Sequence, residues 1–169
     1  MSVATQGGNS DRILHDRAPV GMLPTNGEDI LKFVRTNGIL IGEGVADFFR
    51  SYQRVKPENE KLSRKVSILN GQKFLQREYC TFTEIIATGA IFGLSCCTLE
   101  AIVGYRIIRS QELGESIICA MNPVLCSDNL FKILQLVHTS AGYGIESLPA
   151  GEKYLFRDHH NWLFEREIY

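Results

Sequence analysis

Two arginines, Arg77 and Arg106, each stand in a strand-like run of apolar neighbours and not in a cluster of charges. An arginine that points inward from a sheet needs an anion, because burying an unpaired guanidinium is costly. Its planar fork matches a carboxylate at two points. The functional interpretation is a pocket for a small carboxylate between sheet and helices. The structural alternatives are exposure on an edge or an internal salt bridge to Glu78, Glu84, Glu100 or Glu115.

The other side chains that could do chemistry favour structural roles. Cys96 and Cys97 are adjacent, so on a strand they would point to opposite sides and could not hold one metal together. They also lie in an apolar run, whereas a reactive thiol needs an electropositive setting. His159 and His160 follow Asp158 in a polar stretch typical of exposed histidines. The chain has neither a nucleophile elbow nor a phosphate-binding glycine loop. We therefore expect no metal and no cofactor.

Composition narrows the class of protein. The 169 residues include 44% hydrophobic and 22% charged side chains, which is a globular balance. Eighteen basic and nineteen acidic residues give a net charge of −1, which argues against an electrostatically driven nucleic-acid binder. The apolar stretch Ile85–Val103 is interrupted by polar residues and too short to span a membrane. Five cysteines in apolar segments suggest reduced thiols, so we expect a cytoplasmic protein.

The chain divides into a flexible arm over residues 1–26 and one domain over residues 27–169. Acidic residues before Ile30 fit either a first helical turn or an edge strand. Apolar residues between 41 and 52 recur at helical spacing and predict an amphipathic helix. Residues 88–103 fit a central strand, a strand pair broken at Gly93 or a core helix, because periodicity does not distinguish them.

The remaining segments predict three hairpins and one helix. The hairpins cover residues 66–82, residues 105–121 and residues 154–164, and the helix follows Ser127 over Leu130, Ile133, Leu134 and Val137. Together these elements predict an α+β fold, in which a mostly antiparallel sheet carries two or three helices on one face.

Three short sequence segments occur in an order that resembles that of a known protein family. Residues 34–41 read VRTNGILI and precede the amphipathic helix, Arg106-Ile107-Ile108 precedes Gly114-Glu115, and residues 148–156 read LPAGEKYLF. Between residues 30 and 169 this order resembles the chorismate pyruvate-lyase superfamily, whose fold is shared by the ligand-binding domains of a class of bacterial transcription regulators.

The resemblance implies an antiparallel sheet flanked by helices around an enclosed pocket. The lyase splits chorismate into 4-hydroxybenzoate and pyruvate without a cofactor. By the same resemblance Arg106 would grip a carboxylate, the backbone near Ala150 would touch the ring, and Glu165 or Glu167 would assist the elimination as a general acid. Arg77 would supply a second cation.

Two functions follow as expectations. The first is a protein that binds a small aromatic or enolpyruvyl carboxylate in an enclosed pocket and, if it is an enzyme, cleaves it. The second is a non-catalytic interaction or assembly protein, viral or accessory, with a homo-oligomer among its expected states. Its partner surface would combine residues 85–103 with the C-terminal aromatics Trp162, Phe164 and Tyr169.

Overall fold

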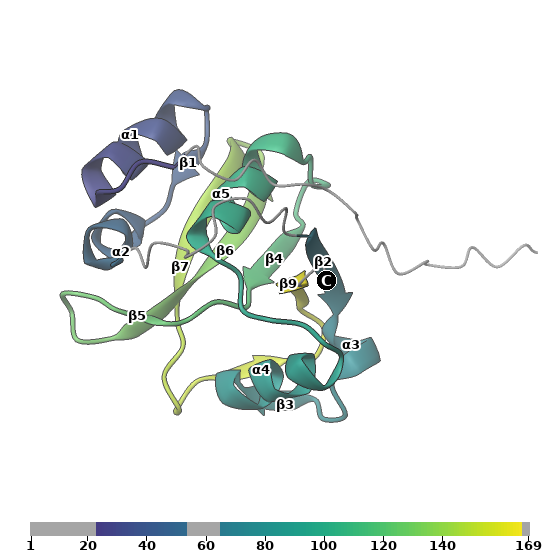
Figure 1. Ribbon diagram of the computed structural model, residues 1–169. Helices are drawn as coiled ribbons and strands as arrows, with labels where there is room; N and C mark the ends of the chain where they lie inside the picture. The colour runs from purple at the N-terminus through teal and green to yellow at the C-terminus, as the bar shows by residue number, and fades with distance from the viewer. Residues whose placement is uncertain (1–22, 54–64, 167–169) are drawn as a thin grey trace, which may run out of the picture.

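The computed structural model of the chain describes residues 23–53 and 65–166 (Figure 1). Within these ranges the fold is α+β, as the sequence predicts. The helices are α1 (Gly27–Thr36), α2 (Val45–Ser51), α3 (Gly71–Phe74), α4 (Phe82–Ile91) and α5 (Leu99–Ile108). The strands are β1 (Leu40–Ile41), β2 (Lys65–Asn70), β3 (Tyr79–Thr81), β4 (Ser116–Cys119), β5 (Val124–Leu125), β6 (Phe131–Thr139), β7 (Gly142–Pro149), β8 (Leu155–Arg157) and β9 (Asn161–Arg166).

One mixed, mostly antiparallel sheet organises the molecule. Its strand order is β1-β7-β6-β4-β9-β2, with β5 paired to β6 beside this path. The β1–β7 and β4–β9 pairs are parallel, and the other pairs are antiparallel. Strands β3 and β8 form a separate antiparallel ribbon. Helices α1 and α2 lie at one end of the sheet, and α4 lies with β3 at the other (Figure 1).

The pairing register tells which side chains share a face, because paired residues point to the same side. Glu165 and Leu163 are two residues apart in β9, so their side chains lie on the same face. Their partners Val66 in β2 and Cys119 in β4 share that face. Following the β4–β6 and β6–β7 pairs places His138 and Tyr143 on that same face. Phe164 and its neighbour two residues back, Trp162, therefore point to the opposite face.

Each face has its own cover. On the Phe164 face, α4 approaches so closely that a Cβ on Gly89 would lie 2.5 Å from the Phe164 ring. The ring of Trp162 contacts Phe82 of α4 and Phe156 of β8 on this side. On the Glu165 face, the start of α5 is bound by the Glu165 side chain. Helices therefore cover both faces of the sheet, and not one face as predicted.

Side-chain caps explain where the helices begin. Asn26 accepts a hydrogen bond from the Asp29 amide at the start of α1. At α4, Thr81 and Glu84 form a reciprocal capping box, in which each side chain accepts from the other residue's backbone amide. These caps fix the first turns of α1 and α4. The two helices differ in polarity, because α1 has one polar and one apolar face and α4 is apolar nearly all round.

The segment 88–103, left open between strand and helix, is mostly helical. It contains the end of α4, a short link and the start of α5. The helix predicted between residues 41 and 52 is confirmed over Val45–Ser51 as α2, whereas Ile41 belongs to strand β1. Residues 28–34 belong to α1, so the helical alternative is the correct one there.

Four predictions of local structure are wrong. Residues 66–82 do not form a hairpin, because α3 follows β2 directly and β3 pairs with β8. Residues 105–108 end helix α5, so β4 does not pair with them. The helix predicted after Ser127 is strand β6, which forms a hairpin with β7. Strands β8 and β9 exist where the last hairpin was predicted, but they pair in different sheets.

The ends of the chain are described in part. Residues 1–22 of the predicted arm lie outside the described residues, whereas Leu23 is buried and Asn26 caps α1. The described residues therefore extend the fold four residues into the predicted arm. In the described ranges, none of the helices has the length and apolar character needed to cross a bilayer.

Candidate functional site

Arg106 lies in the last turn of helix α5, and its predicted place in a strand is wrong. The prediction failed because α5 is buried on nearly every side and rich in β-branched residues, so it lacks a polar stripe. The predicted burial of its side chain is nevertheless found, since Arg106 is only 2% exposed. It points toward the sheet face that carries Tyr143.

The guanidinium of Arg106 has three neighbours in the described part of the chain. One terminal nitrogen donates to Gln111 Oε1 and the other donates to the Arg109 carbonyl. The Tyr143 ring lies against the guanidinium, with its centroid 4.2 Å from Cζ. A cation at the C-terminus of a helix is favoured by the helix dipole, and the ring face attracts it further. These contacts hold the side chain in place.

The charge of Arg106 is not balanced by a carboxylate among the described residues. The described ion pairs join other residues, and Glu115 acts on Arg106 only through its more distant field. The Nε atom is buried, and no group in residues 23–53 or 65–166 hydrogen-bonds to it. Burial lowers the pKa of Arg106, which shows the cost of keeping the cation there. One edge of the fork is thus left able to donate to an anion.

Three further residues complete this site, and sequence reasoning did not single them out together. Gln111 donates through Nε2 to the Leu136 carbonyl at 3.4 Å, which fixes the amide that binds Arg106. His138 Nδ1 donates to the Gln111 carbonyl at 2.8 Å. The His138 ring stacks on Tyr143 with 4.1 Å between centroids. We call Arg106, Gln111, His138 and Tyr143 the Arg106 cluster.

Tyr143 covers one face of the Arg106 guanidinium. It is partly exposed and lies next to the β6–β7 turn, opposite His138. A sequence signal for these residues existed in the hairpin register, because the β6–β7 pairing places Tyr143 directly opposite His138. That signal was lost when β6 was interpreted as a helix.

Glu165 lies on the same sheet face as Arg106 but at the other end of α5. Its Oε1 accepts from the Thr98 amide at 2.9 Å and from the Thr98 hydroxyl at 2.7 Å, so it binds the first turn of the helix. Thr98 and Arg106 are eight residues apart, which is about 12 Å along a helix. The general-acid role of Glu165 stays a prediction, and Glu167 lies outside the described residues.

Arg77 and Ala150 are placed away from the Arg106 cluster. Arg77 is in a loop, its side chain is 74% exposed, and it pairs with Glu84 at 3.2 Å. This pair belongs to α4, on the opposite face of the sheet. The structure thus favours the salt bridge, which was the structural alternative for Arg77. Ala150 is buried, and its amide donates to the Phe131 carbonyl at 2.9 Å.

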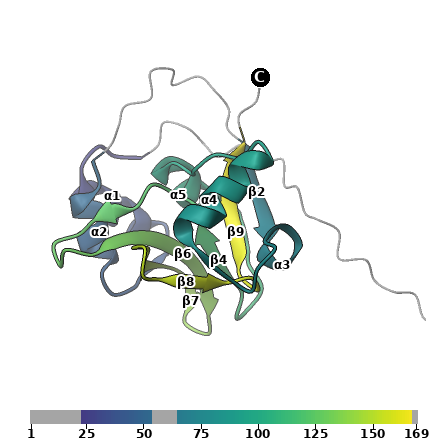
Figure 2. The ribbon, with the colours of Figure 1, turned by 90° about the horizontal axis from the view of Figure 1, so that it is seen from below.

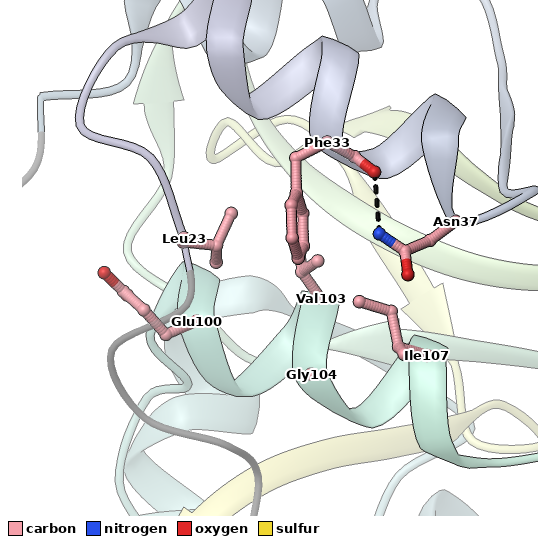
Figure 3. Close-up of a pocket in the computed structure, with 7 residues that line it drawn as sticks. All are labelled: Leu23, Phe33, Asn37, Glu100, Val103, Gly104 and Ile107. Atoms are coloured by element: carbon pink, nitrogen blue, oxygen red, sulfur yellow. Dashed lines mark hydrogen bonds between the residues drawn. The ribbon is translucent and has the colours of Figure 1, made fainter.

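The structure also has a shallow pocket of about 100 Å³ between α1 and α5 (Figure 3). It is apolar and open on one side, whereas the sequence predicts an enclosed pocket. Phe33 and Val103 form its walls. Arg106 is not among the residues that line it, so this pocket does not serve the guanidinium. Its full lining is Leu23, Phe33, Asn37, Glu100, Val103, Gly104 and Ile107.

The thiols and histidines do not form a second site. Burial raises the pKa of Cys97 well above its usual range, and the neighbouring Glu165 and Cys119 raise it further. Cys96 is half-buried and its pKa is also raised by burial, so it is a poor nucleophile at neutral pH. The His159 and His160 rings lie 4.4 Å apart in the β8–β9 turn. Among the described residues no group of three potential ligands could hold a metal ion.

Comparison with known proteins gives no match: no family model, curated protein or solved structure is similar to this chain. The resemblance to the chorismate pyruvate-lyase superfamily therefore stays a prediction. The site has to be interpreted from its own geometry.

Proposed function

We propose that the protein binds a small organic carboxylate, aromatic or enolpyruvyl, at the guanidinium of Arg106. The observation that carries the proposal is a 98%-buried cation that lacks a carboxylate partner within the described ranges. A bound carboxylate would neutralise the charge and accept from the buried Nε. Both effects offset the desolvation cost of burying the guanidinium.

The neighbours of Arg106 favour a planar ligand. Tyr143 stacks on the guanidinium and His138 stacks on Tyr143. A ligand with its own ring or conjugated system replaces these contacts when Tyr143 moves aside, because flat groups gain from stacking on arginine and on aromatic rings. Gln111 stays in place through Leu136 and presents the arginine in a fixed orientation.

Binding without cleavage fits the geometry better than a lyase reaction. An elimination needs an acid within hydrogen-bond reach of the bound substrate. Glu165 is engaged at the far end of α5, and Arg77 lies on the other face of the sheet. The proposal is therefore a carboxylate-binding protein in which Arg106 binds the anion.

The experiment is a set of thermal melts and calorimetric titrations with 4-hydroxybenzoate and with its neutral amide, 4-hydroxybenzamide. Binding to the folded state raises the melting temperature by mass action. We expect the acid to bind and the amide to bind at least about tenfold more weakly, since a charge-assisted hydrogen bond contributes about 1.5–3 kcal/mol.

Three variants make the test specific. Arg106→Lys keeps the charge but loses the fork and should weaken binding about tenfold or more. Tyr143→Ala removes the ring that the ligand must displace and should tighten binding several-fold. Arg77→Ala, an exposed arginine, is the matched control and should bind like the wild type. Equal affinity of wild type and Arg106→Lys for the acid would refute the site.

A second candidate function, in assembly with another protein, is favoured by one observation. Helix α4 ends on two exposed apolar side chains, Ile91 at 82% and Phe92 at 53% exposure. The aromatic part of the predicted partner surface is wrong for two of its three residues, because Trp162 and Phe164 are buried in the core. The third, Tyr169, lies outside the described residues.

The double variant Ile91→Ser, Phe92→Ser separates the two functions. If α4 is the partner surface, this variant loses capture of a partner from the source cell and keeps its affinity for 4-hydroxybenzoate. Retained capture together with lost carboxylate binding would contradict the assignment of α4.

A further inference from the structure

The two edges of the main sheet differ sharply. At one edge β1 has only two residues, which leaves little backbone for another strand to pair with. At the other edge β2 has six residues, Lys65–Asn70, and no described residue pairs with its outer side. Figures 1 and 2 both show β2 beside β9 at the margin of the sheet.

The hydrogen-bond pattern shows which groups of β2 face outward. Gly71 donates to the His160 carbonyl, and Ser95 exchanges two backbone hydrogen bonds with Glu165 on the side of β9 away from β2. With the β2–β9 register, this alternation directs the backbone groups of Ser67 and Leu69 toward β9. The N–H and C=O groups of Val66 and Ile68 therefore point away from the sheet.

The open edge lacks the features that keep monomers apart. Proteins usually protect such edges with charged side chains, prolines, bulges or very short strands. Strand β2 reads KVSILN, without proline, and its one charge is Lys65 at the first position. The pairing with β9 is continuous over all six residues, so the strand has no bulge.

We infer that β2 is the contact between two copies of this chain, paired antiparallel edge to edge. A twofold axis at Ser67 would set Val66 of one copy opposite Ile68 of the other. This register brings apolar side chains together and covers the half-buried Ile68. It sets Lys65 opposite Leu69, so the two lysines stay at opposite ends of the pair. A second copy thus offers matching donors, acceptors and side chains without facing like charges.

This contact is independent of the Arg106 cluster, which lies at the far end of α5. It is also small, because a stable interface of standard size covers about 800 Å² on each partner. We therefore expect a reversible dimer that forms at roughly micromolar concentration.

The first test is sedimentation equilibrium of the full chain over a range of concentrations. The wild-type mass should rise from 19.0 kDa toward twice that value. Ile68→Pro should stay monomeric, because proline removes an outward donor and spares the bonds to β9. Leu155→Ser, at an exposed apolar residue of the separate β3–β8 ribbon, is the control and should dimerise like the wild type. A wild type that stays monomeric at the highest concentration, or an Ile68→Pro protein that dimerises equally, would overturn the inference.

The second test needs no variant, so it holds even if Ile68→Pro fails to fold. Amide hydrogen exchange of the wild type should show at least tenfold slower exchange at Val66 and Ile68 as the concentration rises. Ser67 and Leu69 donate to β9 and should be protected at every concentration. Exchange at Val66 and Ile68 that is fast at all concentrations would refute pairing through this edge.

Discussion

At the scale of single residues, Glu165 supplies a capping carboxylate from outside the helix that it caps. Its Oε1 accepts both the amide and the hydroxyl of Thr98, and that hydroxyl in turn accepts from the Ala101 amide. The three groups form a chain of hydrogen bonds that joins β9 to α5. A residue predicted to be a general acid thus has a clear structural task.

Glu165→Ala should lower the free energy of unfolding by about 1–3 kcal/mol, because it leaves two part-buried donors of Thr98 without their acceptor. Glu165→Gln keeps an acceptor oxygen and should cost less. Urea unfolding measures both. Binding of 4-hydroxybenzoate should be the same in Glu165→Gln and wild type. Unchanged stability in Glu165→Ala would contradict the capping role.

His160 gives the protein a pH-dependent stability. Burial lowers the pKa of His160, and the positive charges of His159 and Arg157 lower it further. The folded state therefore binds the proton less well than the unfolded state, whose histidine titrates near 6.5. Stability should be at its full value above that pH and should fall as the pH drops below it.

Thermal melts of wild type and His160→Gln between pH 5 and 8 test this dependence. The wild-type melting temperature should decline toward pH 5, and the variant should decline less. His159→Gln keeps the titrating group and should retain most of the decline. Parallel curves for wild type and His160→Gln would show that His160 does not contribute.

Residue chemistry was predictable from the sequence only in part. The burial of Arg106 was predicted, because one arginine in a long apolar run has nowhere polar to go. Its partners were not, since Gln111, His138 and Tyr143 meet only after α5 packs on the β6–β7 hairpin. Arg77 looked similar in sequence but ended in a loop beside Glu84.

At the scale of elements, the periodicity of apolar residues misled the prediction of α4 and of β6. Thr81 and Glu84 have the spacing of a capping box, and this is the signal that could have identified α4 from the sequence. Leu130, just before β6, and Ile133, Leu134 and Val137 within it have helical spacing by coincidence. Ile133 and Leu134 point to opposite faces of a sheet that is covered on both, so both are buried and strand alternation is lost.

The fit of α4 against β9 depends on the absence of a side chain at Gly89. A Cβ there would lie 2.5 Å from Phe164 Cε1 and 2.9 Å from Cζ. Gly89→Ala should therefore cost about 1–3 kcal/mol of stability through overpacking, although alanine favours a helix by about 1 kcal/mol over glycine.

Urea unfolding of Gly89→Ala measures this cost, and a double-mutant cycle with Phe164→Leu assigns it to the contact. The smaller ring-free side chain should relieve most of the penalty of the alanine. Ala87→Gly, on the exposed side of α4, is the control and should show only the loss of helix propensity. A stabilised Gly89→Ala protein would show that α4 sits further from β9.

At the scale of the whole molecule, the sheet separates two surfaces with different chemistry. One face carries α1, α2, α5 and the Arg106 cluster, and the other carries α4 and the β3–β8 ribbon (Figures 1 and 2). The α+β class was predictable because short strand-like runs and one amphipathic helix suffice for it. The order of strands was not, because it depends on contacts far apart in the sequence.

The proposed anion site lies at the C-terminal end of α5, beside the β6–β7 hairpin. The β2 edge lies at the other end of the strand order. Ligand binding and self-association can therefore be measured separately. A variant at one place should not change the behaviour of the other.

The Nε–H resonance of Arg106 in nitrogen-15 NMR reports on the guanidinium itself. Its assignment comes from the signal that disappears in Arg106→Lys. Titration with 4-hydroxybenzoate should move this resonance downfield and saturate, because the Nε–H gains a charged acceptor. The neutral amide should leave it in place. A resonance that stays in place at every concentration of the acid would contradict the proposal that Arg106 binds the carboxylate. The same conclusion would follow if the acid bound but the resonance did not move.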